Sequence, residues 1–181
     1  MPVAGVDQNL ILTGYIGPGQ LAIARQVAER LRRPFVDFEL LLEDRAGLPG
    51  DELRLRFGEA RLKTLESDLV TEVALYRGTV IHISGKTLLT HYARLSETGP
   101  LICMVARLDA VLRRLHLALG ARYHDPRERD MALGTLRREW AIRQRPGVTE
   151  IDTSYMSDEQ MVEAVAACWR EKSGVIDWRR V

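Results

Sequence analysis

The chain has 181 residues, with 26 lysines and arginines against 25 aspartates and glutamates, and 46% of its residues are hydrophobic. This length fits a single domain, and the near-neutral charge gives no general attraction to nucleic acid or to a membrane surface. No apolar run approaches the roughly 18 residues that a membrane span needs. We therefore expect one cytoplasmic domain over residues 1–181 that binds neither nucleic acid nor membrane. The two cysteines and four histidines match no metal-binding motif, so no metal site is predicted.

Strand and helix patterns alternate along the chain. Short apolar segments predict strands at residues 9–13, 35–37, 79–83, 100–105 and 149–153. Amphipathic or capped segments predict helices at residues 20–31, 40–45, 51–76, 88–95, 108–119, 131–143 and 157–172. This alternation predicts an α/β fold with a parallel five-stranded sheet covered on both faces. Ligands of such sheets bind at the carboxyl ends of the strands, so the polar residues that follow the strands are the first site candidates.

The junction between the first predicted strand and the first predicted helix resembles a phosphate-binding loop. Such a loop reads G-x-x-x-x-G-K-[ST], and here Gly14 and Gly19 occupy the glycine positions. Gln20 stands in place of the lysine, and Leu21 in place of the hydroxyl residue that ligates Mg²⁺. Backbone N–H groups of Gly14, Gly17 and Gly19 still suit an anion, which predicts weak binding of a nucleotide with little contribution from Mg²⁺. The alternative is a turn that only joins strand to helix.

Acidic residues follow the second predicted strand. Asp37 and Glu39 can hold Mg²⁺ through water or accept the proton of a substrate hydroxyl. The alternative is structural, because acidic side chains are stabilised at the start of a helix.

A second glycine-containing junction follows the third predicted strand, at residues 84–87. Lys86 comes directly after Gly85, and this strand is expected beside the strand that precedes the loop. Lys86 is therefore predicted to point toward Gly17 and Gln20 and to replace the missing loop lysine, unless it points into solvent as most surface lysines do. His82, within the same strand, is interpreted as a hydrogen-bonded core residue rather than a catalytic one.

Taken in order, these motifs resemble those of the shikimate kinase family. The resemblance rests on the glycine loop, an acid pair after the second strand, a G-E-x-x-F-R-x-x-E helix segment in which Lys63 stands in place of the arginine, a glycine junction after the third strand and a final I-D-T-S. The residues are Gly14, Gly17, Gly19, Asp37, Glu39, Gly58, Glu59, Lys63, Glu66, Ser84, Gly85 and Ile151 to Ser154. It implies a three-layer P-loop NTPase fold with a lid at about residues 120–130.

The resemblance also assigns roles. It places a nucleotide, ATP in the family, at Gly14, Gly17, Gly19 and Gln20. It places the acceptor at Glu39, Lys63 and Gly85, and it gives catalytic roles to Asp37, to Lys86 as the replacement lysine, and to Arg122 as the lid arginine. A further arginine that the family carries before its last strand has three loose candidates, Arg137, Arg138 and Arg143.

Two functions follow from these features. The first is a divergent protein that binds a nucleotide or another small anionic ligand, is weak or inactive as a kinase, and acts through that ligand or a protein partner. The second is an active ATP-dependent phosphotransferase on a small hydroxylated anionic acceptor. The departures fall on Gln20 and Leu21, the positions that handle charge during phosphoryl transfer, and they favour the first.

Overall fold

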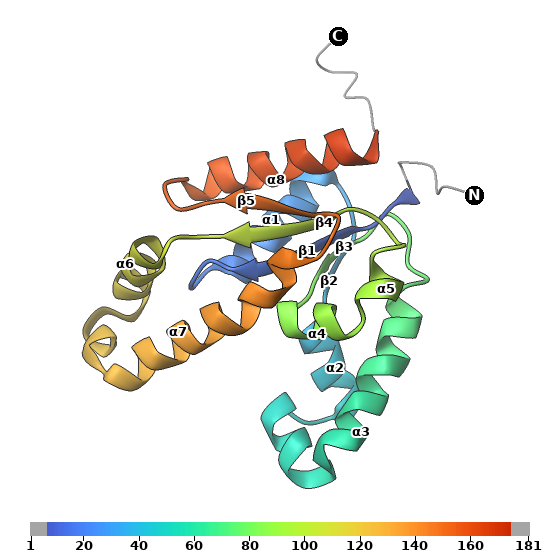
Figure 1. Cartoon of the computed structure of the whole chain (residues 1–181), viewed down its shortest axis with the longest axis horizontal. Coiled ribbons are helices and arrows are strands. Elements are labelled where there is room, and N and C mark those ends of the chain that lie inside the picture. The colour runs from blue at the N-terminus through green and yellow to red at the C-terminus, as the bar shows by residue number, and fades with distance from the viewer. Residues whose placement is uncertain (1–6, 175–181) are drawn as a thin grey trace.

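A computed structural model describes residues 7–174 of the chain. Its five strands form one sheet in which every neighbouring pair is parallel, in the order β2-β3-β1-β4-β5 (Figure 1). The strands are β1 (Leu10–Tyr15), β2 (Phe35–Asp37), β3 (Val80–His82), β4 (Leu101–Val105) and β5 (Val148–Asp152). The predicted α/β fold class is confirmed, as is the expectation that the third strand lies beside the first.

The helices surround this sheet on both faces. They are α1 (Gln20–Leu31), α2 (Phe38–Ala46), α3 (Gly50–Val73), α4 (Gly85–Thr90), α5 (Tyr92–Leu95), α6 (Leu108–Leu119), α7 (Pro126–Glu139) and α8 (Asp158–Ser173), with 3₁₀ turns η2 (Gly120–His124) and η3 (Trp140–Gln144). In Figure 1, α2 and α3 extend from the sheet as an arm, and α7 runs beneath the ends of β1 and β4.

Three helix predictions need correction. The helix expected at residues 88–95 is two short helices, and the first begins at Gly85 because the Ser84 side chain caps it by accepting from Thr87 N–H. The long helix at 51–76 bends at Gly58, whose φ of 77° is left-handed and leaves the helical region. The helix expected at 131–143 begins earlier, at Pro126, because Asp125 caps it and Pro126 stands in its first turn, and it ends at Glu139, before η3.

Two apolar layers enclose the sheet because β1 buries side chains on both of its faces. Ile11 packs with α2, α3 and α4, whereas Leu10 and Leu12 pack with α1 and α8. All three are fully buried. A strand covered on both faces reads as a continuous apolar run, which is the pattern of residues 10–12. Among the described residues, no helix has the length and apolarity needed to cross a membrane.

Candidate functional site

The carboxyl ends of β1, β2 and β3 meet at one cavity. These strands are neighbours, and the register places Asp37 of β2 opposite His82 of β3. The cavity has a volume of about 370 Å³. It is lined by the first glycine loop, the acids after β2, the end of β3 and the facing side of α7: Gly14, Tyr15, Gly17, Gly19, Gln20, Leu21, Asp37, Glu39, His82, Ser84, Thr135 and Glu139.

The backbone of the first loop requires its glycines. Gly14, Gly17 and Gly19 have φ values of 105°, 98° and 91°, a region that residues with a Cβ rarely adopt. At Gly14 there is also no room, because an added Cβ would lie 2.0 Å from the carbonyl oxygen of Met104 on β4. Arg114 of α6 fastens the loop from outside by donating to the Ile16 carbonyl at 2.9 Å. Arg114 was not among the residues that the sequence analysis singled out.

Gln20 folds back into the loop. Its Oε1 accepts from the Ile16 N–H at 3.0 Å, and its Nε2 donates to the Gly14 carbonyl at 2.6 Å. These two bonds fix the orientation of the amide, because an N–H must face an oxygen and a carbonyl must face an N–H. The loop thus uses one of its own side chains to satisfy its inner polar groups.

His82 joins this loop to the acids. Its Nε2 lies 3.1 Å from Gln20 Nε2, and since the Gln20 amide orientation is fixed, Gln20 is the donor and His82 the acceptor. The ring therefore carries its proton on Nδ1. Nδ1 lies 3.7 Å from Asp37 Oδ1, which is beyond hydrogen-bond distance. His82 is hydrogen-bonded, as interpreted from the sequence, but it lines the cavity rather than a closed core.

Two carboxylates occupy the junction after β3. Glu39 accepts from the Ser84 N–H at 2.8 Å, and Glu139 of α7 accepts from the Gly85 N–H at 2.5 Å. Burial raises the pKa of both carboxyls, and the charge of Glu39 adds to the effect on Glu139. The amides at Ser84 and Gly85 oppose these shifts by stabilising the charged forms. The backbone donors that an anionic acceptor would use are therefore already bound to acids.

Asp37 differs from these two acids. Burial raises the pKa of its carboxyl, but the His82 ring and the backbone N–H groups of Glu39 and Leu40 outweigh it, and the net shift is downward. Asp37 is therefore ionised at neutral pH and can accept a proton or a cation. With Glu39 and His82 it forms a group in which one ligand atom from each residue lies within 4.8 Å of the others.

The predicted site residues separate into two sets. Gly14, Gly17, Gly19, Gln20, Asp37 and Glu39 line the cavity, and Gly85 contacts its wall through Glu139. Lys86 and Lys63 do not line it. Both side chains are exposed, and the charge of Lys86 acts on Glu66 of α3. The prediction that Lys86 points toward Gly17 and Gln20 is therefore wrong, because the helix that begins at Gly85 turns it outward. The Arg122 side chain lies outside the described part of the chain.

The cavity contains two functional candidates beyond the predicted set: Glu139, which the sequence did not single out, and His82, which was interpreted as a core residue. The late arginine was sought in Arg137, Arg138 and Arg143, yet Arg143 pairs with Glu150 and Arg138 bonds to Thr135. Glu139, the neighbour of Arg138 on α7, reaches the cavity instead. His82 is the second. The sequence signal that could have placed it at the cavity was its position near the end of a strand expected to lie beside two others. Mg²⁺ at the loop does not fit these residues, since Leu21 offers no oxygen ligand where the motif needs a hydroxyl.

Comparisons with known proteins agree with this fold. The sequence model described as shikimate kinase matches residues 16–169. The shikimate kinase of Geobacter sulfurreducens is 31% identical over 117 residues, which cover 64% of this chain and 65% of that protein. That of Pelotomaculum thermopropionicum is 29% identical over 168 residues, covering 87% of this chain and 93% of that protein.

Solved structures show the same architecture. The shikimate kinase of Bacteroides thetaiotaomicron superposes with a TM-score of 0.70 at 23% identity, covering 91% of this chain and 96% of that one. The shikimate kinase of Acinetobacter baumannii, solved with shikimate, superposes with a TM-score of 0.69 at 16% identity, covering 96% and 97%. At these identities the structural likeness concerns the fold alone.

Proposed function

Because the chain belongs to the shikimate kinase family, we propose that it is a divergent member that binds a nucleotide or another phosphate anion weakly, through the backbone of the Gly14–Gln20 loop, and is weak or inactive as a kinase. The observation that carries this proposal is the Gln20 side chain inside the loop, bonded to both Ile16 N–H and the Gly14 carbonyl. A phosphate oxygen has to compete with Gln20 for that N–H group. Gln20 also brings no charge to offset the charge of the transferred phosphoryl group.

The charges around the cavity support weak anion binding. Its described lining includes Asp37, Glu39 and Glu139 but neither a lysine nor an arginine. Like charges within several ångströms repel, and the repulsion grows as water is excluded. A triphosphate, or the anionic acceptor expected from the sequence, therefore meets unfavourable charge here.

The proposal is tested by titration calorimetry of ATP, once with Mg²⁺ and once with EDTA. We expect binding with a Kd of about 1 mM, near −4 kcal/mol, and little difference between the two conditions. The double variant Gln20→Lys/Leu21→Thr restores the charge and the metal ligand on a loop whose glycine geometry is present, so it should bind at least about tenfold more tightly with Mg²⁺, a gain of about 1.4 kcal/mol.

The matched control is Gln144→Lys/Leu117→Thr, which makes the same changes at exposed positions outside the cavity lining. It should bind ATP as the wild type does. Tight binding by the wild type that disappears with EDTA would contradict the proposal. No gain in a folded Gln20→Lys/Leu21→Thr protein would show that the loop no longer accepts phosphate.

A second candidate function, phosphotransfer to a hydroxylated acceptor, is favoured by Asp37. Its lowered pKa keeps it ionised in the cavity, where it can take the hydroxyl proton as the acceptor oxygen bonds to the γ-phosphorus and ADP leaves. The three acids of the lining favour a neutral or cationic acceptor over an anionic one. ADP release measured with shikimate, myo-inositol and glucosamine distinguishes these acceptors, and Asp37→Asn should abolish any turnover. Turnover with shikimate alone would support the anionic acceptor.

A further inference from the structure

We propose that Asp37, Glu39 and His82 form a binding site for a first-row transition-metal ion, and that the ion drives Gln20 out of the phosphate loop. One ligand atom from each of the three residues lies within 4.8 Å of the others, a spacing that a single ion can bridge. The ligands come from rigid positions, because Asp37 and His82 are register partners on β2 and β3, and Glu39 stands in the first turn of α2.

The atoms that face one another here lack other partners. Asp37 Oδ1 and His82 Nδ1 are both buried, and among the described residues neither has a hydrogen-bond partner. Their separation of 3.7 Å is too long for a direct bond but leaves space for an ion that contacts both. Glu39 accepts from the Ser84 N–H through Oε1, which orients the carboxylate beside the other two ligands.

The ligand set indicates the class of ion. One imidazole nitrogen and two carboxylate oxygens suit Zn²⁺, Co²⁺, Mn²⁺ or Fe²⁺, whereas Mg²⁺ and Ca²⁺ prefer oxygen alone. Three protein ligands leave coordination positions open, and the cavity of about 370 Å³ lies beside them. This site does not use the loop hydroxyl that Leu21 has replaced.

The link to Gln20 follows from the two nitrogens of one ring. With Gln20 in the loop, His82 Nε2 accepts from Gln20 and the ring proton is on Nδ1. An ion on Nδ1 requires a neutral ring whose proton is on Nε2. That proton would then face the Gln20 NH₂ group, donor against donor, at 3.1 Å. Turning the amide over would instead oppose Ile16 N–H and the Gly14 carbonyl, so Gln20 must leave, and Ile16 N–H becomes available to an anion.

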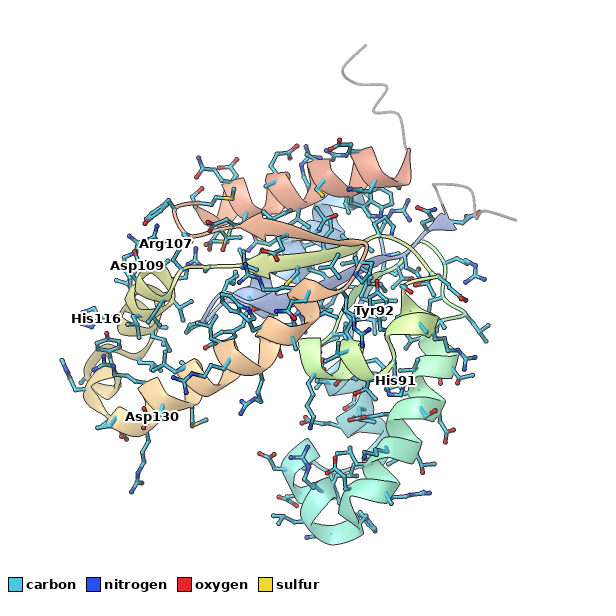
Figure 2. All side chains as sticks on the ribbon, viewed as in Figure 1. His91, Tyr92, Arg107, Asp109, His116 and Asp130 are labelled. Atoms are coloured by element: carbon cyan, nitrogen blue, oxygen red, sulfur yellow. The ribbon has the colours of Figure 1, made fainter. Side chains whose placement is uncertain are left out.

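The site is tested with Co²⁺, whose visible absorption reports its coordination, and with Zn²⁺ by titration calorimetry, both on the full chain. His82→Gln and Glu39→Gln should each weaken Co²⁺ binding at least about tenfold, a loss of about 1.4 kcal/mol. The matched control is His91→Gln. His91 lies between α4 and α5 (Figure 2) and does not line the cavity, and its Nε2 is 4.0 Å from the Glu66 carboxylate. Co²⁺ binding that is equal in wild type and folded His82→Gln overturns the site.

A second measurement needs no variant that risks unfolding. In ¹⁵N spectra of the wild-type histidine rings, Zn²⁺ should shift Nδ1 of one ring and convert its Nε2 to the protonated form. Absence of such a ring at saturating Zn²⁺ also overturns the site.

The link to the loop is tested at Gln20 through metal affinity alone, so its outcome is independent of nucleotide binding. Gln20→Leu removes the opposing donor and should tighten Co²⁺ binding severalfold. Gln20→Glu also supplies an acceptor for the Nε2 proton and should tighten it at least about tenfold. Unchanged affinity in both variants would overturn the link between metal and loop, while the dependence on His82 would still decide the site.

Discussion

Two glycine-containing junctions lie side by side in this protein, and they satisfy their backbone donors by opposite means. The loop after β1 closes on a neutral amide, that of Gln20, which bonds to Ile16 N–H. The junction after β3 binds two carboxylates, Glu39 on Ser84 N–H and Glu139 on Gly85 N–H. An anion can compete with a neutral amide for its donor, but at the second junction it must displace two carboxyl groups, which repel it whenever they are ionised. Two junctions with similar glycines are therefore not equivalent anion sites. The side chains that bind their backbone N–H groups determine the local charge, and these side chains differ between the two.

The largest effect on stability is expected from replacing the glycine of each junction with alanine. Gly14→Ala puts a Cβ 2.0 Å from the Met104 carbonyl oxygen of β4, which cannot move without breaking the sheet. We expect a loss of at least about 3 kcal/mol of unfolding free energy, measured by urea denaturation. Gly85→Ala meets a flexible side chain instead, Glu139 Oε2 at 2.5 Å, and should cost about 1 kcal/mol.

The control for the left-handed backbone is Gly19→Ala. Gly19 has a φ of 91° and no atom within 4 Å of an added Cβ, so only strain of about 1–2 kcal/mol is expected. Equal losses for Gly14→Ala and Gly19→Ala would show that the β4 contact is unimportant.

The next effect tests the neutral junction. Gln20→Leu leaves the Ile16 N–H and the Gly14 carbonyl without their partner, and an unsatisfied buried polar group costs about 1–3 kcal/mol. We expect Tm to fall by about 2–4 °C for each kcal/mol. Added inorganic phosphate should raise the Tm of Gln20→Leu more than that of the wild type, because the N–H group is then free to bind it. An identical phosphate response in both proteins would contradict the competition inferred here.

A pH series tests the charged junction. The pKa of Glu139 is raised in the folded protein by burial and by Glu39. Stability from this carboxyl is therefore fully present below its ordinary pKa and declines as pH rises through the raised value. The side chain of Glu139→Gln stays neutral and can still accept from Gly85 N–H. The Tm of this variant minus that of the wild type should therefore increase by a few degrees between pH 5 and pH 8, at about 2–4 °C for each kcal/mol.

The control is Glu171→Gln, which removes the same charge from the exposed surface of α8. Its Tm difference from wild type should not change between the two pH values. A Glu139→Gln difference that is equally flat would show that the carboxyl is not destabilised by its surroundings.

The smallest effect concerns the helices that the two junctions begin. Gly19 precedes α1 without any side-chain cap, whereas Ser84 caps α4 by accepting from Thr87 N–H at 3.2 Å. Ser84→Ala should cost about 1 kcal/mol, seen as a small fall in the urea midpoint. Gly19→Ser tests the other junction, and it should not gain the cap because its φ of 91° suits glycine.

The sequence by itself determined the elements and the edge of the sheet where the site lies. Apolar runs such as residues 10–12 and the capped segment at residues 157–172 are local patterns, and a strand and a helix formed there as predicted. The glycine spacing from Gly14 to Gly19 likewise located the loop, because positive φ values are a property of the residue itself.

Only the tertiary structure decided which side chains meet there. Glu139 reaches Gly85 across 54 residues, and Gln20 reaches His82 across 62, contacts that depend on strand register and on the path of α7. No local pattern carries that information. Lys86 shows the same limit, since it directly follows Gly85 at the start of α4 and its side chain is exposed, while Glu139 of α7 occupies the Gly85 N–H beside it. The sign of the charge in the cavity is therefore a property of the packed fold.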